Sequence, residues 1–269
     1  MMSQFNRLCC WLGSGAIALI FLTFNLDIRQ TFQAQSSGRE ASQRQQTTIG
    51  TILTSFDQQG QQQQLKIESV SLDAQDPEQE ISLYTVLYHH TDGDWRNLCQ
   101  PDIEGVAKAI PLSGRWDETG SYVDDDSLTF ACTNGAIAKC VRWGYKPWKT
   151  VRGESLRDYH QACTRMVRAD YCGNGNSHTQ AGTPIDVSDR LGLQQRSQQS
   201  GMVFEAAWGV DGVLQLNRLR FQEATTQLQK ECPEKIAAAQ QPTLQTNVQP
   251  NTPTVDDSRP LLFNDSFLQ

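Results

Sequence analysis

The sequence predicts an α+β fold: an antiparallel, β-rich, disulfide-bonded domain with one central helix and a C-terminal helix. Three observations support this class. Short segments in the first half alternate between apolar and polar residues, residues 154–167 place apolar side chains at intervals of three and four, and the chain contains 8 cysteines. With 269 residues, of which 38% are hydrophobic, the chain can form one sizeable core.

Composition and charge exclude two classes of function. The formal net charge is -7, and the sequence has no basic cluster that could release counterions from phosphates, so we expect no nucleic acid partner. Continuous apolar sequence occurs only near the N-terminus, which excludes a membrane protein with several spans.

The N-terminal residues 1–36 are expected to be a signal peptide or an N-terminal membrane anchor. Residues 8–26 are almost entirely apolar, and a helix of that length spans about one bilayer. Ala34-Gln35-Ser36 offers the small-x-small spacing that a signal peptidase requires. Both alternatives place the remainder outside the cytoplasm, as a secreted or periplasmic protein. Contact with a membrane is expected only through this segment, if it is uncleaved.

The next two regions differ in character. Residues 37–46 are rich in Ser, Gln and Arg without apolar periodicity, which predicts a linker. Residues 47–94 are predicted to be a β-rich N-terminal region, because alternating and β-branched segments are separated by turns at Gly60, Asp76-Pro77 and 91–94. This region either adds strands to the following domain or forms a separate module.

Residues 95–239 are predicted to form a cysteine-containing domain. We expect strands at 107–112 and 128–132, then the central helix from Glu154, which Gly173 would cap. A hairpin follows, with strands at 203–208 and 213–219, and a second helix covers 221–235. Residues 240–269 are rich in Gln, Pro, Thr and Asn, which predicts a disordered tail.

The cysteines predict three disulfides. Removal of residues 1–36 leaves an even number, in an oxidising compartment. They are Cys99, Cys132, Cys140, Cys163, Cys172 and Cys232. Short loops favour Cys132–Cys140 and Cys163–Cys172, with Cys99 left for Cys232, which is one of fifteen connectivities. Zinc sites favour pairs separated by two to four residues, and no pair here is that close, so we expect no metal and no cofactor.

Several blocks between Trp95 and Cys232 resemble a known family. They are Leu112-Ser113-Gly114-Arg115-Trp116, Phe130-Ala131-Cys132-Thr133-Asn134-Gly135, Trp143-Gly144-Tyr145-Lys146-Pro147-Trp148, His160-Gln161-Ala162-Cys163, Ser177-His178-Thr179 and Gly182-Thr183-Pro184-Ile185-Asp186-Val187. The family is the ADYC-domain family, named for four residues that stand here as Ala169-Asp170-Tyr171-Cys172. The resemblance implies a bacterial, extracytoplasmic domain of unknown function, without established catalytic residues.

The polar residues around this motif are the candidate catalytic residues. In a thiol enzyme, Cys172 would be the nucleophile, His160 or His178 its base, and Asp170 or Asp186 the orienting carboxylate. The same histidines and carboxylates could perform acid–base hydrolysis without the thiol.

Each of these residues also has a structural interpretation. His160 would be hydrogen-bonded in the interior, Asp170 would accept bonds from backbone amides at the helix end, and His178 would lie in a loop. Arg165 and Arg168 on the same helix would pair with Asp170 or with an acidic loop, or would bind an anion.

Aromatic residues supply a candidate binding site. Trp143, Tyr145 and Trp148, with Lys146, could stack on sugar faces or peptide prolines, or could pack in the core against the disulfides. The acidic residues 124–126 could hold calcium weakly or form a solvated turn. An EF-hand starting at Asp170 is excluded, because its twelfth position is Ala181.

The sequence therefore favours a non-catalytic, disulfide-stabilised module that binds an unknown protein or glycan at the cell envelope. The alternative is a secreted hydrolase that uses His160, Asp170, Cys172 or His178. A binding module should expose Trp143, Tyr145 or Trp148, whereas an enzyme should bring the histidines and aspartates together in a cleft.

Overall fold

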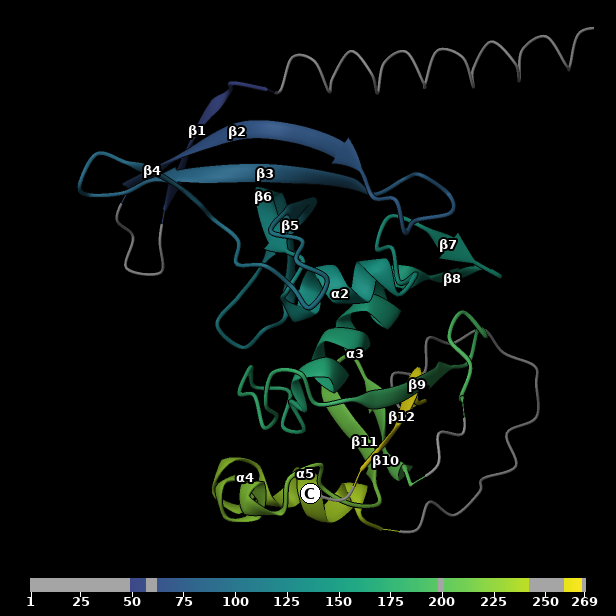
Figure 1. Ribbon diagram of the computed structural model, residues 1–269. Helices are drawn as coiled ribbons and strands as arrows, with labels where there is room; N and C mark the ends of the chain where they lie inside the picture. Colours follow the sequence, from purple (N-terminus) through teal and green to yellow (C-terminus); the bar gives the residue numbers. More distant parts are fainter. Residues whose placement is uncertain (1–48, 57–61, 198–200, 242–258, 268–269) are drawn as a thin grey trace, which may run out of the picture. The chain divides into compact units, whose positions relative to one another are not determined.

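The structure is a computed structural model that describes residues 49–56, 62–197, 201–241 and 259–267 (Figure 1). Two antiparallel sheets, a short hairpin and several helices make up these ranges, so the predicted α+β class is confirmed. None of the described helices is long and apolar enough to cross a membrane. The apolar segment 8–26 and the linker 37–46 lie outside the described residues.

The first sheet contains the N-terminal half of the described chain. Its strands are β1 (Ile52–Phe56), β2 (Gln62–Leu72), β3 (Ser82–His89), β4 (Trp95–Asn97), β5 (Ala109–Trp116) and β6 (Tyr122–Cys132). The order is β1-β2-β3-β5-β6, with β4 also paired to β3. Tyr84 of β3 pairs with Ala109 of β5, so the strands of residues 47–94 extend the sheet of the cysteine-containing region.

Alternating side chains give the first sheet two apolar faces. Ile81, Leu83 and Ile110 pack with Val141 of the helix α2 (Ala136–Arg142). The opposite face buries a second cluster. Its core members are Leu65, Ile67, Val86, Cys99 and Ala109. The two clusters lie on opposite faces of the sheet, and α2 packs on the first of them.

The second sheet has the order β11-β10-β12-β9. Its strands are β9 (Ile185–Asp189), β10 (Val203–Gly209), β11 (Gly212–Leu216) and β12 (Leu262–Ser266). The predicted hairpin is confirmed as β10–β11. Residues 262–266, which we expected to belong to a disordered tail, instead pair with both β10 and β9. A further two-stranded sheet joins β7 (Thr150–Val151) and β8 (Glu154–Ser155).

The central helix α3 (Leu156–Arg168) lies between these parts and contacts β10, β11 and β12 as well as α2 (Figure 1). Ser155 caps its first turn by accepting a hydrogen bond from the Arg157 N–H at 3.2 Å. The expected end at Gly173 is wrong, because Ala169 already adopts the left-handed conformation, with φ 51°.

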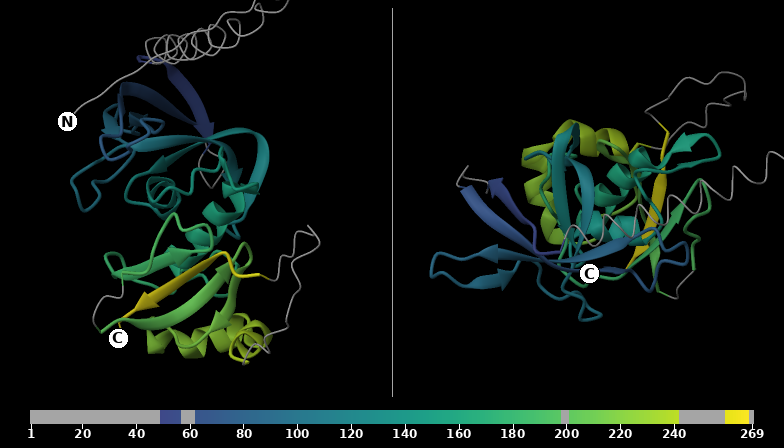
Figure 2. Two further views of the ribbon diagram at one scale, coloured as in Figure 1. Left: turned by 90° about the vertical axis from the view of Figure 1, so that its right-hand side faces the viewer. Right: turned by 90° about the horizontal axis from the view of Figure 1, so that it is seen from above.

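The predicted C-terminal helix is divided into shorter pieces. A 3-10 turn (Gln222–Ala224) leads into α4 (Thr225–Glu231), and α5 (Pro233–Ala239) follows after Cys232. Pro233 ends the first helix and starts the second, because a proline N–H is missing but is not needed at a first helical position. The helix α5 packs against β11 of the second sheet (Figure 2).

All six cysteines predicted to form disulfides do so, but the expected pairing is wrong. The bonds are Cys99–Cys132, Cys140–Cys163 and Cys172–Cys232. Their Cα–Cα distances are 5.3, 5.9 and 5.7 Å. Disulfide geometry requires such distances, and the fold provides them across elements rather than along short loops. One bond, for example, joins α2 to α3.

Candidate functional site

The motif Ala169-Asp170-Tyr171-Cys172 closes the C-terminus of α3. Ala169 turns the backbone through the left-handed region, and the Asp170 N–H then donates to the Arg165 carbonyl at 2.9 Å. Ala169 is completely buried, so a small side chain is needed at this turn. The first motif residue is therefore explained by helix termination.

Asp170 organises the loop that follows. Its Oδ1 accepts from the N–H groups of Gly173 and Asn174 at 2.9 and 3.1 Å, and its Oδ2 accepts from the Gly175 N–H at 2.9 Å. Oδ2 also lies 2.6 Å from Nη1 of Arg165, which is equally buried. The structural interpretation of Asp170, and its pairing with Arg165, are confirmed.

Arg165 connects this loop to two other turns. Its Nη2 donates to the Ser121 hydroxyl at 2.8 Å and its Nη1 to the Thr119 carbonyl, both in the β5–β6 turn. Its Nε donates to the Val210 carbonyl in the β10–β11 turn at 3.2 Å. One buried guanidinium thus joins α3 to a hairpin turn of each large sheet.

Tyr171 belongs to a buried network behind the motif. Its hydroxyl donates to Glu205 Oε1 at 3.0 Å and accepts from the Arg220 N–H at 2.9 Å, and its ring stacks on Trp208 at a centroid distance of 5.2 Å. Burial raises the pKa of Tyr171 above its ordinary value. Glu205 in turn pairs with the Arg220 guanidinium at 3.0 Å.

The free carbonyls at the end of α3 are satisfied by cationic and polar side chains. Arg220 donates to the carbonyls of Met166 and Val167 at 2.9 and 3.3 Å. His178 contacts the Ala169 carbonyl through Nδ1 at 3.2 Å, and its backbone N–H donates to the Arg168 carbonyl at 3.0 Å. A positive charge at a helix C-terminus is favourable, because the carbonyl dipoles converge there.

Glu205 and Arg220 were missed as important residues in the sequence. Glu205 is the one acidic residue in the otherwise apolar strand β10, and it is completely buried. A carboxylate at such a position requires a partner, because burying an unpaired charge is very costly. An acidic residue in an apolar strand could therefore have indicated a buried ion pair, although the sequence does not show which basic residue is the partner.

The proposed catalytic residues are dispersed. Cys172 is bonded to Cys232, so its sulfur is not a thiolate in this oxidised form. His160 is buried beside Trp116, and its Nε2 lies 3.0 Å from the Ile137 carbonyl. Burial lowers the pKa of His160 to about 4. Its predicted structural role in the interior is confirmed.

His178 and Asp186 have separate surroundings. His178 Nε2 lies 3.4 Å from Glu231 Oε2 without forming a hydrogen bond, and it has no other acceptor among the described residues. Both oxygens of Asp186 accept from the Ser197 N–H, at 3.0 and 2.9 Å. Neither residue lines the cavity described below.

The aromatic platform is only partly at the surface. Tyr145 is completely buried and donates to Asp189 at 2.9 Å, Trp143 is partly buried, and Trp148 is 49% exposed. Lys146 is not available to a ligand, because its ammonium is buried between Asp76, Glu78 and Glu80 at 2.9, 2.6 and 2.9 Å. These carboxylates outweigh burial and hold the pKa of Lys146 above its ordinary value.

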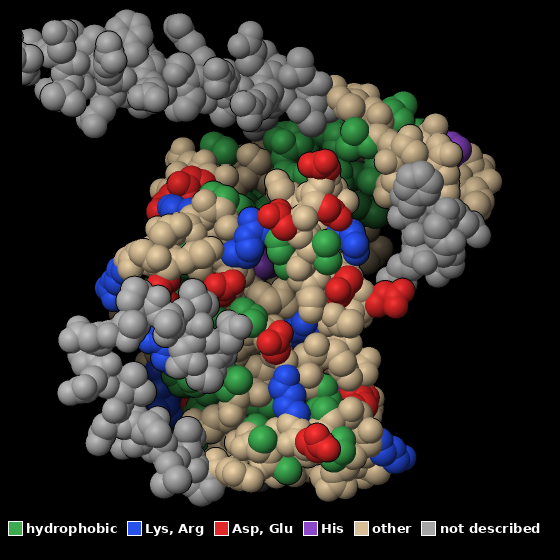
Figure 3. Space-filling model, turned by 180° about the vertical axis from the view of Figure 1, so that it is seen from behind, with side chains coloured by type: hydrophobic (Ala, Val, Ile, Leu, Met, Phe, Trp, Pro, Cys, Tyr) green, Lys and Arg blue, Asp and Glu red, His purple; other side chains and the backbone are tan. Residues whose placement is uncertain are grey.

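The acidic residues 124–126 lie on the exposed part of β6, where Asp125 pairs with Arg115 at 2.9 Å. Across the described ranges, no group of three or more His, Cys, Asp or Glu side chains is arranged to hold a metal ion. On the face shown in Figure 3, acidic and basic side chains are interspersed.

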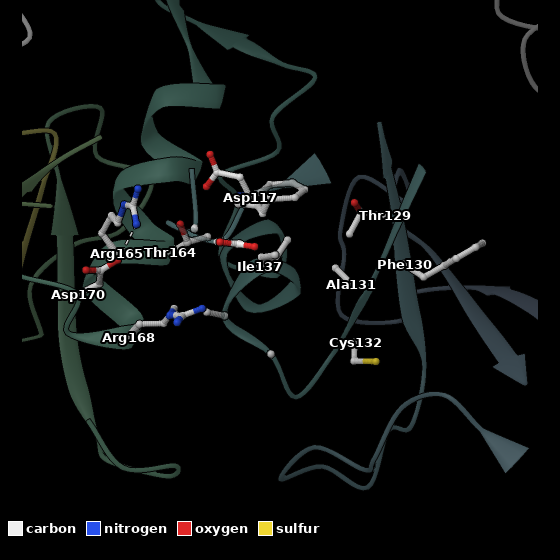
Figure 4. A pocket seen from close by; sticks show the side chains of 15 residues that line it. Asp117, Thr129, Phe130, Ala131, Cys132, Ile137, Thr164, Arg165, Arg168 and Asp170 are labelled. Atoms are coloured by element: carbon white, nitrogen blue, oxygen red, sulfur yellow. Dashed lines mark hydrogen bonds and ion pairs between the residues drawn. The ribbon is translucent and has the colours of Figure 1, made fainter. Parts of the chain in front are cut away.

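A cavity of about 490 Å³ lies between β6, α2 and α3 (Figure 4). Its wall combines apolar side chains with polar ones, with two arginines and with the carboxylates of Asp117, Glu118 and Asp170. The lining residues that matter here are Trp116, Thr129, Ile137, Thr164, Arg165 and Arg168. Asp170 also borders it, and of the four predicted catalytic residues it alone does so.

Arg168 is the cationic group that this cavity offers to a ligand. Its side chain is exposed, and among the described residues it has no carboxylate within ion-pair distance; its guanidinium donates to the Gly175 carbonyl. Arg165, in contrast, is already paired with Asp170. Arg168 can therefore accept an anionic group of a ligand that also has apolar parts, while Asp117 and Glu118 give another part of the same wall two carboxylates.

Comparison with known proteins supports the family assignment. The family model described as the ADYC domain matches residues 45–222, which is well over half of the chain. The match includes β1 to β3, which precede the resemblance that starts at Trp95, and it stops before Cys232. No curated protein and no solved structure matches the chain. The chain belongs to the ADYC-domain family.

Proposed function

We propose that this chain is an exported, non-catalytic module that binds a protein or glycan at the cell envelope. One observation carries the proposal: a cavity lies beside the ADYC motif and is lined by Arg168, which has no carboxylate partner among the described residues, while the polar groups of the motif itself are used to build the cavity wall. The motif then acts as a rigid support, and the ligand contacts side chains around it.

A non-catalytic role is supported by the state of the candidate catalytic groups. Asp170 borders the cavity, but its two oxygens already accept three backbone N–H groups and face Arg165. Cys172 is held in a disulfide. General acid–base catalysis needs a group within hydrogen-bond reach of the substrate, and a carboxylate with all these partners is poorly suited to it.

An extracytoplasmic location is compatible with the three disulfides, because such bonds persist in oxidising compartments. Residues 1–36 would direct export, either as a cleaved signal peptide or as a retained anchor.

The test is a binding experiment with the exported chain on an array that carries short peptides and bacterial cell-wall oligosaccharides. We expect discrete binding that Arg168→Glu weakens by about tenfold or more, because a hydrogen bond to a charged group is lost. Lys230→Glu is the matched control, since Lys230 is exposed on α4 and does not line the cavity.

Two outcomes contradict the proposal. One is the absence of binding to either class of probe. The other is that the oxidised chain turns over ester, amide or glycoside substrates, and that this activity is lost in a variant that still folds but has His178 or Asp170 replaced.

A further inference from the structure

The cavity is bordered by the free edge of β6. This strand is the last in its sheet, and β5 is its neighbour on one side. Four consecutive residues of β6, Thr129 to Cys132, line the cavity. Successive side chains of a strand point to opposite faces, so Thr129 and Ala131 can border the cavity with their side chains and the residues between and after them with their backbone at the strand edge. In Figure 4, Thr129 and Ala131 point toward the cavity and Phe130 points away from it.

The register of β5 and β6 shows which backbone groups face this edge. The Thr133 N–H donates to the Lys108 carbonyl at 2.9 Å, and in an antiparallel pair such bonds recur at every second residue. Ala131 and Thr129 are therefore bonded to β5. Phe130 lies opposite Pro111, which has no N–H, and its own N–H and carbonyl point away from β5.

The same alternation directs the backbone groups of Leu128 and the N–H of Cys132 outward. Within the described part of the chain, the Cys132 carbonyl accepts from the Gly135 N–H at 2.8 Å, whereas the register leaves the N–H groups of Leu128, Phe130 and Cys132 without a bond to β5. This edge offers donors at every second residue, which is the pattern that another strand requires.

Charged side chains occupy only one half of the β6 edge. Asp124, Asp125 and Asp126 are exposed in the half of β6 near the hairpin turn, and charged side chains discourage edge-to-edge pairing. The other half has no charge: Thr129 to Cys132 line the cavity, and Leu128, just before them, is 54% exposed. Arg168 on α3 lines the same cavity as this uncharged half.

Resting on the proposed function, and narrowing it, we infer that the cavity binds an extended peptide segment of a partner protein. The peptide pairs with the edge of β6 at Leu128–Cys132 and places a carboxylate, from a side chain or its own C-terminus, against Arg168. Addition of a strand to a free sheet edge derives affinity from main-chain hydrogen bonds. An oligosaccharide lacks alternating N–H and C=O groups, so it would leave this pattern unused.

The test uses an acidic peptide selected on the array and resynthesised with single N-methyl groups at each position in turn. Methyl groups on alternate residues should each weaken binding by about tenfold, while those between them should have little effect, because successive N–H groups of a strand point to opposite sides. Loss of binding without this two-residue period would overturn the inference.

Variants of the protein test the other side of the same contact. Leu128→Pro removes an outward N–H without breaking a bond to β5, and Leu128→Ala removes the exposed side chain but keeps the N–H. We expect Leu128→Pro to bind the peptide about tenfold more weakly than Leu128→Ala. If Leu128→Pro does not fold, the N-methyl series still decides the matter.

The remaining outcomes separate this inference from the proposed function. If the chain binds only oligosaccharides, the proposed binding function stands and the inferred peptide ligand is wrong. A concentration-dependent dimer of the full chain that Leu128→Pro dissociates would assign the edge to a second copy of this chain instead. A chain that binds nothing on the array contradicts both proposals.

Discussion

Nη1 of Arg165 lies 2.6 Å from Oδ2 of Asp170, and both side chains are almost completely buried. The pair joins the last turn of α3 to the loop after it, and Arg165 extends the connection to the turns at Thr119 and Val210. Because the carboxylate also accepts three backbone N–H groups, its loss would leave several buried polar groups unpaired.

Replacement of Asp170 by Ala should therefore destabilise the domain by about 3 to 5 kcal/mol, the usual result of removing one partner from a buried ion pair. Asp170→Asn should cost less, because the amide oxygen still accepts from the loop. Denaturant unfolding under non-reducing conditions measures the difference. Asp126→Ala, at an exposed position of β6, is the control, and an equal effect of both substitutions would contradict the role of Asp170.

Removal of the Tyr171 hydroxyl should destabilise the domain by about 1 to 3 kcal/mol, because Tyr171→Phe leaves the Arg220 N–H without its acceptor. Tyr88→Phe is the matched control. Tyr88 is partly buried and its hydroxyl makes no hydrogen bond among the described residues, so its loss should change the free energy of unfolding by about 0.5 kcal/mol or less. If the two variants are equally stable, the network around Tyr171 is not important for folding.

The disulfide pairing predicts both a peptide map and a rank order. Proteolysis without reductant should release peptides joined as Cys99–Cys132, Cys140–Cys163 and Cys172–Cys232. The last bond closes the longest loop, 60 residues, so its removal should cost most, about 4 kcal/mol in the loop-entropy model. Thermal unfolding compares two double variants, Cys172→Ala/Cys232→Ala and Cys140→Ala/Cys163→Ala. A free Cys172 thiol in the untreated protein would contradict the assigned pairing.

The local elements could be predicted from the sequence, whereas the long-range pairings could not. Alternation along 81–88 and the helical spacing from Leu156 reflect burial of one face, which the residues themselves record. The strand β12 was missed because its neighbours are polar and it is stabilised by β9 and β10 rather than by its own composition. The short helix α2 escaped prediction because seven residues give too little periodicity.

The predicted disulfide pairing was wrong for a related reason. Loop length favoured Cys132 with Cys140, but Cys132 ends β6 and Cys140 faces α3, so the fold brings each nearer to another cysteine. The cavity could not be predicted from the sequence either, because it depends on β6 being the last strand of its sheet. The sequence allowed Arg165 and Arg168 either to pair with Asp170 or an acidic loop or to bind an anion; the structure pairs Arg165 with Asp170 and leaves Arg168 without a carboxylate partner among the described residues.

The buried imidazole of His160 should make stability depend on pH. Burial lowers its pKa to about 4, below the ordinary value of 6.5, so the unfolded chain binds a proton more readily than the folded domain. The contribution of His160 is therefore fully present above about pH 6.5 and is lost as the pH falls from there toward about 4. Between about pH 7.5 and about pH 4.5 the loss should be about 2 to 3 kcal/mol.

His160→Gln isolates this effect from the titration of the carboxylates. A glutamine amide can still donate to the Ile137 carbonyl, and it does not ionise. Unfolding curves of both proteins at the two pH values give a double difference. We expect the advantage of the wild-type chain to shrink by about 2 to 3 kcal/mol on acidification. A difference that stays constant would mean that His160 is not kept neutral by burial between Trp116 and Ile137.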